Sequence, residues 1–423
     1  MPRSNAPRDM LGREELTPAQ AARTILTRYL EAREPETETI TIGEALGRIT
    51  AEDIYAPEDL PPCDRSTMDG YAVISRDTFG ASQSSPAYLS IAGEVLMGEV
   101  PDIQIDSGTC IKIPTGGILP GGADAVMMFE HTVPIDDHMI EIVKDVGSGG
   151  NVIRKGDDIG IGERAVSAGT RLRPQDLGLL AGLGLSKVCV CKKISIGIIS
   201  TGDEIIDHAE PLVPGKTRNI NSITIAALVR QLGALVTDYG IVSDNEPVFF
   251  STLERAVAET DIVLFSGGSS VGMRDLGEQA ITRLGSPGVL VHGVALKPGK
   301  PVIIGYCRNT PIFGLPGHPV SAAVCFDLFV KPAAFLLSGL KNHEHMPQAT
   351  ITAVLNRNIN SAAGRLDIIR VRLAMEKTTC QAYPVLGKSG AISSLSRAHG
   401  YFMIDEDTQG LQKGQLIEVH VYQ

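Results

Sequence analysis

The sequence lacks the surplus of positive charge that nucleic-acid-binding proteins and proteins of anionic membrane surfaces usually carry. Its 423 residues include 38 Lys and Arg against 49 Asp and Glu, so the formal net charge is −11 at pH 7 and the pI is about 5.4. Most of such a surface repels a polyanion, although a local basic pocket can still hold a phosphate. We therefore expect no nucleic-acid partner and no membrane partner.

Cysteine is too sparse and too scattered to form a disulfide framework. The seven cysteines are odd in number and lie mostly in apolar stretches, which is typical of free thiols in a reducing compartment. Cys189 and Cys191 form the only close pair, and their C-x-C spacing without a second pair favours a buried strand over a metal site.

Long apolar runs are missing as well. Residues 1–16 are polar and contain no apolar leader segment, and nowhere do about 18 uncharged apolar residues follow one another. We therefore expect a cytoplasmic protein. With 43% hydrophobic residues, a chain of this length is expected to form several cores and to divide into three or four domains of about 50 to 150 residues.

The residue pattern changes along the chain and predicts an α/β multidomain protein. Residues 1–60 and 145–190 are expected to form an elongated N-terminal domain of helical and extended segments. Residues 61–144 contain short alternating strands and predict an inserted β-rich domain. Apolar strands alternate with helices in residues 191–340, which predicts a mainly parallel sheet covered on both faces. Residues 341–423 predict a C-terminal β-barrel-like domain.

Two helix starts are predicted near the N-terminus. The segments Thr17-Pro18-Ala19-Gln20 and Thr41-Ile42-Gly43-Glu44 both have the spacing of a capping box. Apolar residues follow the first at helical spacing, which predicts an amphipathic helix. The second is expected to start a shorter helix that ends near Gly47.

The strongest candidate for chemistry follows a predicted strand at residues 261–265. The segment Ser266-Gly267-Gly268-Ser269-Ser270-Val271-Gly272 leads to Asp275 and a helix. Adjacent glycines allow a tight turn that presents backbone N–H groups, and the helix N-terminus adds positive potential. The segment matches neither a Walker A loop nor G-x-G-x-x-G. Its place after a parallel strand favours an anion-binding loop over a simple turn.

Acidic residues follow two further strands. Glu204 comes after the strand at residues 194–200, and Asp244 comes after the strand at 235–242. If neighbouring strands bring them beside Asp275, the three carboxylates can hold a divalent cation, although capping of the next turn is an equal alternative.

Basic residues occupy a proline-stiffened turn farther along the chain. Lys297 and Lys300 in Lys297-Pro298-Gly299-Lys300-Pro301 are suited to complement a phosphate, and a pair of surface lysines is the simpler reading. The segment 314–322 then ends a strand and starts a helix. Its His318 is a candidate ligand or, more commonly for a loop histidine, a surface donor.

Taken in this order, the motifs resemble the molybdopterin molybdenumtransferase family, called MoeA in bacteria and represented in animals by the C-terminal part of gephyrin. The segments that carry the resemblance are 66–73, 115–126, 151–159, 200–204, 266–275, 297–301 and 314–322. The resemblance implies insertion of molybdenum from molybdate into adenylylated molybdopterin, with release of AMP and with Mg²⁺. It also implies an elongated homodimer with sites shared between protomers, and as protein partners the molybdopterin adenylyltransferase and the enzymes that receive the cofactor.

The resemblance assigns roles to individual residues. Catalytic roles are implied for Asp69, Thr115, Asp158, Glu204, Asp244 and Asp275, of which Glu204, Asp244 and Asp275 would also hold the metal. Binding of the molybdopterin substrate is implied for Ser266, Gly267, Gly268, Ser269, Ser270, Gly272, Lys297, Lys300, Pro316, Pro319, Arg365 and Arg370. This sequence has His318 and His399 where the family commonly has Asn. Two alternatives remain open, a non-catalytic molybdopterin-binding scaffold and a molybdopterin adenylyltransferase.

Overall fold

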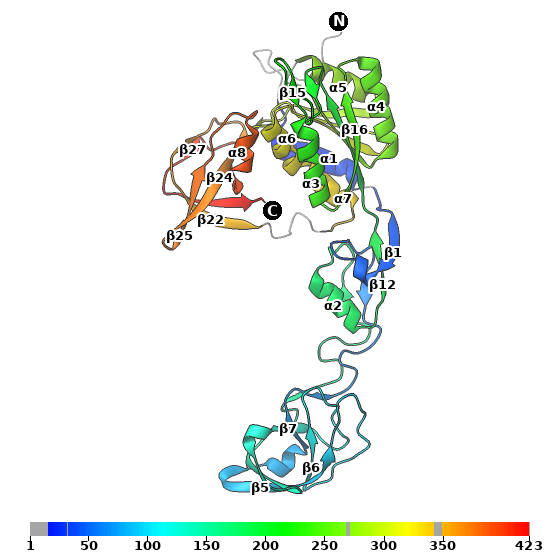
Figure 1. The fold of residues 1–423 in the computed structure, drawn as a ribbon, viewed down its shortest axis with the longest axis vertical. Helices are drawn as coiled ribbons and strands as arrows, with labels where there is room; N and C mark the ends of the chain where they lie inside the picture. Colours follow the sequence, from blue (N-terminus) through cyan, green and yellow to red (C-terminus); the bar gives the residue numbers. More distant parts are fainter. Residues whose placement is uncertain (1–15, 32, 268–270, 342–348, 423) are drawn as a thin grey trace.

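The molecule is long and narrow, and its domains follow one another along the long axis (Figure 1). The computed structural model describes residues 16–31, 33–267, 271–341 and 349–422, with side chains described only from residue 276 onward in the helix that begins at Val271. An α/β domain and a β-barrel lie together at one end, and a slender arm leads from them to a β-rich domain at the other. The expected fold class is confirmed.

Six strands form the sheet of the α/β domain: Ser195–Thr201 (β13), Leu235–Val242 (β16), Ile262–Gly267 (β17), Pro287–His292 (β18), Ile303–Cys307 (β20) and Thr310–Leu315 (β21). Their order is β16-β13-β17-β21-β20-β18, with the first four parallel and the last two antiparallel to their neighbours. The direction reverses because a two-residue turn joins β20 to β21. Arg308 and Asn309 in this turn have φ angles of 50° and 64°, as tight hairpins require.

Helices cover both faces of this sheet. One face is covered by Ala19–Leu30 (α1), Ile220–Gln231 (α3), Pro319–Cys325 (α6) and Lys331–Leu337 (α7), the last two joined by the π-helical turn Phe326–Val330 (η4). The other face is covered by Glu246–Glu259 (α4) and Val271–Leu284 (α5). Burial on both faces explains why the inner strands β17, β20 and β21 are mainly apolar, whereas the edge strand β16 contains Thr237 and Asp238.

Helix α1 differs from what its sequence predicts. Its apolar face, with Leu26 and Leu30, packs in the core of the α/β domain and not in the arm. No side chain caps its first turn, which begins after Pro18. The segment after Thr41 forms only the 3₁₀ turn Ile42–Glu44 (η1), although Thr41 does donate a hydrogen bond to Glu44 at 2.8 Å.

One helical stretch is long and apolar enough to cross a membrane by length and composition. It runs over Pro319–Leu337, and 67% of its apolar window is buried inside the molecule. It is part of the hydrophobic core that also contains α1 and α3.

The C-terminal domain is a closed barrel. Its strands are Thr350–Leu355 (β22), Leu366–Glu376 (β24), Thr379–Pro384 (β25), Gly400–Ile404 (β26) and Leu416–Val421 (β28). The order β24-β25-β22-β28-β26 is closed by pairing of β26 with β24. Outside this closed set lie the short strands Ile359–Asn360 (β23) and Gly410–Leu411 (β27) and the helix Ile392–Ser396 (α8). The two-residue strand Leu296–Lys297 (β19) of the α/β domain pairs with β24 and so joins the two domains.

The arm consists of chain segments that run out to the inserted domain and back. Its paired elements are Thr37–Thr41 (β1) with Lys187–Cys191 (β12), Ile54–Tyr55 (β2) with Arg164–Val166 (β11), and Arg65–Ser66 (β3) with Val152–Ile153 (β10), and its helix is Pro174–Gly182 (α2). The inserted sheet contains Gly70–Val73 (β4), Ser82–Glu94 (β5), Thr109–Ile113 (β6), Ala125–Met128 (β7), Thr132–Asp136 (β8) and Met139–Lys144 (β9), with the 3₁₀ turns Ser75–Thr78 (η2) and Phe129–His131 (η3).

Candidate functional site

A cavity of about 890 Å³ lies between the α/β domain and the barrel. The α/β domain contributes the carboxyl ends of β17 and β21 and the turn at residues 295–301, and the barrel contributes residues 362–365, 368–370 and 385–389. Open sheets bind ligands at the carboxyl ends of their parallel strands, so the cavity lies where the fold predicts a site.

The lysine turn forms one wall of this cavity. Pairing of β19 with β24 fixes the turn against the barrel, with Lys297 opposite Asp367 in the ladder. Gly299 has a φ of 126°, and a side-chain Cβ there would lie 2.7 Å from Leu296 Cδ2 and 2.8 Å from Cys325 Sγ. The positive φ and this close packing both favour glycine at this position of the turn.

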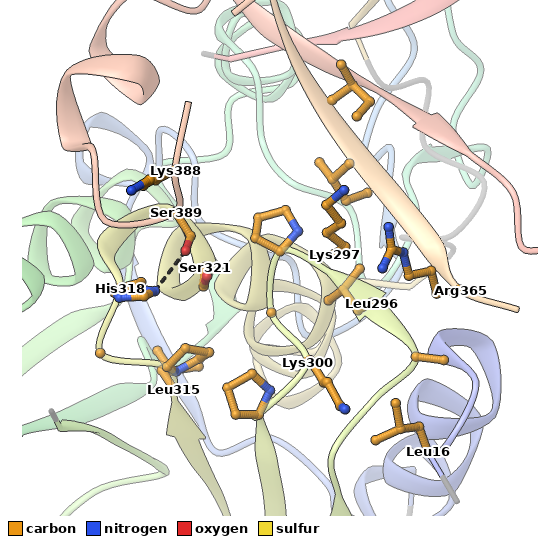
Figure 2. A pocket seen from close by; sticks show the side chains of 18 of the residues that line it. Leu16, Leu296, Lys297, Lys300, Leu315, His318, Ser321, Arg365, Lys388 and Ser389 are labelled. Atoms are coloured by element: carbon orange, nitrogen blue, oxygen red, sulfur yellow. Dashed lines mark hydrogen bonds between the residues drawn. The ribbon is translucent and has the colours of Figure 1, made fainter. Parts of the chain in front are cut away.

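The basic side chains around the cavity are only partly neutralised. Arg365 Nε donates to Oδ1 of the buried Asp367 at 2.8 Å, and Lys297 Nζ lies 3.8 Å from Oδ2 of the same carboxylate. Within the part of the chain that the structure describes, Lys300 and Lys388 form no ion pair. Figure 2 shows these cationic groups on several sides of the cavity. The cavity therefore has a positive surplus although the whole chain is acidic.

Arg370 is the most buried cation at this site. It is 6% exposed, its Nη2 donates one long hydrogen bond to the carbonyl of Gly387 at 3.4 Å, and its buried Nε has no partner. Burial lowers the pKa of Arg370. Tyr422 nearby is no counter-ion at neutral pH, because burial raises its own pKa. An anion in the cavity would supply a hydrogen-bond acceptor and a negative charge for this guanidinium.

His318 and Ser389 meet at the edge of the cavity. His318 Nδ1 and Ser389 Oγ share a hydrogen bond of 2.7 Å, drawn in Figure 2, and Ser321 lies beside them on α6. Neither Lys388 nor Ser389 was predicted as a site residue. The sequence signal that could have found them is Gly387-Lys388-Ser389-Gly390, a glycine-bounded turn with a charge and a hydroxyl.

The cavity brings together several of the predicted binding residues. It is lined by Gly267, Lys297, Lys300, Pro316, Arg365 and Arg370. Ser266 is instead buried in β17, and Pro319 is buried in the first turn of α6. Gly268, Ser269 and Ser270 lie outside the described residues. Gly272 and Asp275 lie in α5, in the part whose side chains are not described.

The predicted carboxylates Glu204 and Asp244 follow neighbouring strands, β13 and β16, and do not line the cavity. Asp244 N donates to Asp203 Oδ1 at 3.1 Å. Burial, followed by repulsion from Asp203 and Glu204, raises the pKa of Asp244. Among the described side chains, no three His, Cys, Asp or Glu residues are arranged to hold a metal. Carboxylate oxygens are the ligand type that a hard divalent cation prefers.

Asp69, Thr115 and Asp158 lie far from this cavity within one chain. Asp69 precedes β4 and Thr115 follows β6 in the inserted sheet, while Asp158 N donates to the carbonyl of Leu60 in the arm at 3.1 Å. Thr115 N donates to Asp69 Oδ1 at 2.7 Å, which lowers the pKa of Asp69. Gly70 permits this turn, because a Cβ there would lie 1.9 Å from the carbonyl oxygen of Met127. All three predicted residues are exposed.

Comparison with known protein families accounts for nearly the whole chain. Residues 16–184 match the MoeA N-terminal region (domain I and II), residues 197–335 match a probable molybdopterin binding domain, and residues 352–422 match the MoeA C-terminal region (domain IV).

Individual relatives agree with these matches. A molybdopterin biosynthesis protein of Methanocaldococcus jannaschii is 38% identical and covers 96% of this chain and 98% of its own length. The molybdopterin molybdenumtransferase of Haemophilus influenzae is 32% identical over 92% of this chain and 94% of its own. The crystal structure of the molybdopterin biosynthesis MoeA protein from Pyrococcus horikoshii OT3 matches with a TM-score of 0.83 and 34% identity, covering 96% of this chain and 100% of that one. The chain therefore belongs to the MoeA family of molybdopterin molybdenumtransferases and has a role in molybdenum cofactor biosynthesis.

Proposed function

We propose that this protein is an enzyme that inserts molybdenum from molybdate into adenylylated molybdopterin and releases AMP. The observation that carries the proposal is the cavity between the α/β domain and the barrel, where Lys300, Arg370 and Lys388 have no carboxylate partner among the described residues. Both substrates are anionic, and charge-assisted hydrogen bonds are the strong contacts by which proteins hold such groups. The unpaired cysteines suit a reducing compartment, and we place the reaction in the cytoplasm.

The residues divide the work according to their chemistry. Lys300, Arg370 and Lys388 bind oxyanion charge inside the cavity. Lys297 and Arg365 both pair with Asp367, which neutralises part of their charge. They contribute mainly N–H donors that can form hydrogen bonds to the substrate. Gly267 and Pro316, which line the cavity, are proposed to contact the pterin tail and its phosphate.

We propose a divalent-cation site on the family resemblance. Glu204, Asp244 and Asp275 would hold Mg²⁺, and when bound it would neutralise charge on the phosphoanhydride that is cleaved. Asp244 is the residue to test first, because burial and then repulsion from the neighbouring carboxylates raise its pKa.

The exposed carboxylate and hydroxyl of the inserted domain are proposed to act at the cavity of a second chain. Asp69 and Thr115 are accessible, are held by a mutual hydrogen bond and lie at the opposite end of the molecule from the cavity. We propose a homodimer in which these residues, together with Asp158, face the cavity of the partner. The adenylyltransferase that supplies the substrate and the enzymes that receive the cofactor are its proposed protein partners.

The test is AMP release by the purified protein with adenylylated molybdopterin, molybdate and Mg²⁺. Release that depends on molybdate and is lost in Lys300→Ala supports the proposal. Arg308→Ala serves as a control, because Arg308 pairs with Glu254 on the surface outside the cavity. Pterin binding without turnover would indicate a scaffold, and ATP-dependent adenylylation of molybdopterin without metal insertion would indicate the adenylyltransferase.

A further inference from the structure

The barrel reaches across the cavity and caps a helix of the α/β domain. At an ordinary helix start, the side chain of the N-cap residue accepts a hydrogen bond from the second or third helical N–H. In α6 the N-cap residue His318 makes no such bond. Instead Val320 N, which is the first N–H of α6 because Pro319 has none, donates to the carbonyl of Ser389 in the barrel at 3.2 Å.

His318 uses its side chain to hold the same barrel residue. Its Nδ1 shares the 2.7 Å hydrogen bond with Ser389 Oγ, so Ser389 is bound to the start of α6 through both its backbone and its hydroxyl. Gly390 follows, and a Cβ there would lie 3.6 Å from His318 Cδ2, so the imidazole also packs beside the loop. Figure 2 shows His318 and Ser389 facing one another from the two domains.

The loop held in this way carries part of the cavity wall. Residues 385–389 all line the cavity, including Lys388, one of its unpaired cations. Gly387 on the same loop accepts the hydrogen bond from the buried Arg370. Movement of the loop would therefore displace Lys388 and would take from Arg370 the one hydrogen bond that its guanidinium makes within the described residues.

We propose that His318 is a positioning residue that clasps Ser389, holds the loop 385–390 over the cavity and thereby sets the affinity for molybdate. The proposal rests on the proposed function, because it assigns the cavity to the anionic substrate. His318 needs no contact with the reacting atoms in this role. Its removal should weaken substrate binding and leave the chemical step almost intact.

The experiment compares His318→Ala, Ser389→Ala and the double variant with the wild type. A single neutral hydrogen bond corresponds to about a three- to tenfold change in affinity, so the Kd for molybdate and the KM should both rise by about that factor while kcat changes by less than about twofold. The double variant should be no weaker than either single one, because both remove the same bond.

A second measurement reports on the loop without any substrate. Hydrogen exchange of the amides in residues 385–390 should accelerate in both single variants. His399→Asn is the matched control, since His399 accepts a bond from Leu373 N within the barrel and does not line the cavity. It should change neither exchange nor affinity.

The two proposals fail in different ways. Unchanged exchange in His318→Ala, or additive effects in the double variant, would overturn the clasp while molybdate binding by the wild type still supports the function. If exchange accelerates in the single variants but the wild-type protein binds no molybdate, the proposed function is overturned. The role of His318 in molybdate affinity then fails as well.

Discussion

Replacing Arg370 by Met should weaken substrate binding without lowering the free energy of unfolding. Arg370 is 6% exposed. Among the described residues its Nε has no partner, and its guanidinium makes one hydrogen bond, the 3.4 Å contact with Gly387. Burial of an ion costs several kcal/mol of desolvation free energy. Without a ligand, the single long hydrogen bond of Arg370 offsets little of this cost. Methionine has a similar volume and no charge. We therefore expect the free energy of unfolding to stay unchanged or to rise by about 1 kcal/mol.

Substrate binding should respond in the opposite direction. A hydrogen bond to a charged group contributes about 1.5 to 3 kcal/mol, so Arg370→Met should raise the Kd for molybdate by about 10- to 150-fold. Urea denaturation measures the first effect and calorimetric titration the second. Arg372→Met is the control, because Arg372 is exposed on the same strand and stacks on Tyr383. A variant that unfolds more easily by over about 2 kcal/mol and still binds molybdate normally would refute the reasoning.

Three further results are expected. Because the pKa of Asp244 is raised in the folded protein, the stability linked to it is fully present below about pH 4 and is lost as the pH rises through that pKa. Without divalent cations, Asp244→Asn should therefore have a higher melting temperature than the wild type at neutral pH and the same melting temperature at low pH. A difference in melting temperature that does not change with pH would contradict this. Mixing inactive Asp69→Asn and Lys300→Ala chains should restore AMP release to about a quarter of the wild-type level if the site is shared, and no recovery would exclude sharing. Leu26→Ala should lower the free energy of unfolding in urea by about 2 to 5 kcal/mol, whereas a loss under about 1 kcal/mol would place α1 outside the core.

Helices and strands were predictable wherever the apolar residues follow a single helical or strand spacing. Strand β16 has the predicted bounds, 235–242, and helix α4 begins at a clear cap signal. Asn245 caps α4 by accepting from Val248 N at 3.2 Å. The partner of α1 was not predictable, because an apolar stripe indicates burial without naming the surface that covers it.

The site was predictable only in part, for a related reason. Lys297 and Lys300 share a turn of the chain, so their proximity follows from sequence alone. Their approach to Arg370 depends on how the barrel packs. The glycine-bounded turn that contains Lys388 and Ser389 is visible in the sequence, but its place at the cavity depends on the same packing. Pairing of β19 with β24 over only two residues decides this geometry, and so short a ladder leaves no recognisable sequence pattern.

The length of the arm has a consequence for how activity depends on concentration. The chain carries Asp69 and Thr115 in a domain that the arm holds away from the cavity, at the other end of the long axis. If turnover needs these residues beside the cavity, a folded but isolated chain has no activity. Specific activity would then follow the law of mass action and fall on dilution below the dissociation constant of the dimer. The abundance of the protein in the cell would thus set the fraction of chains able to work as well as their number.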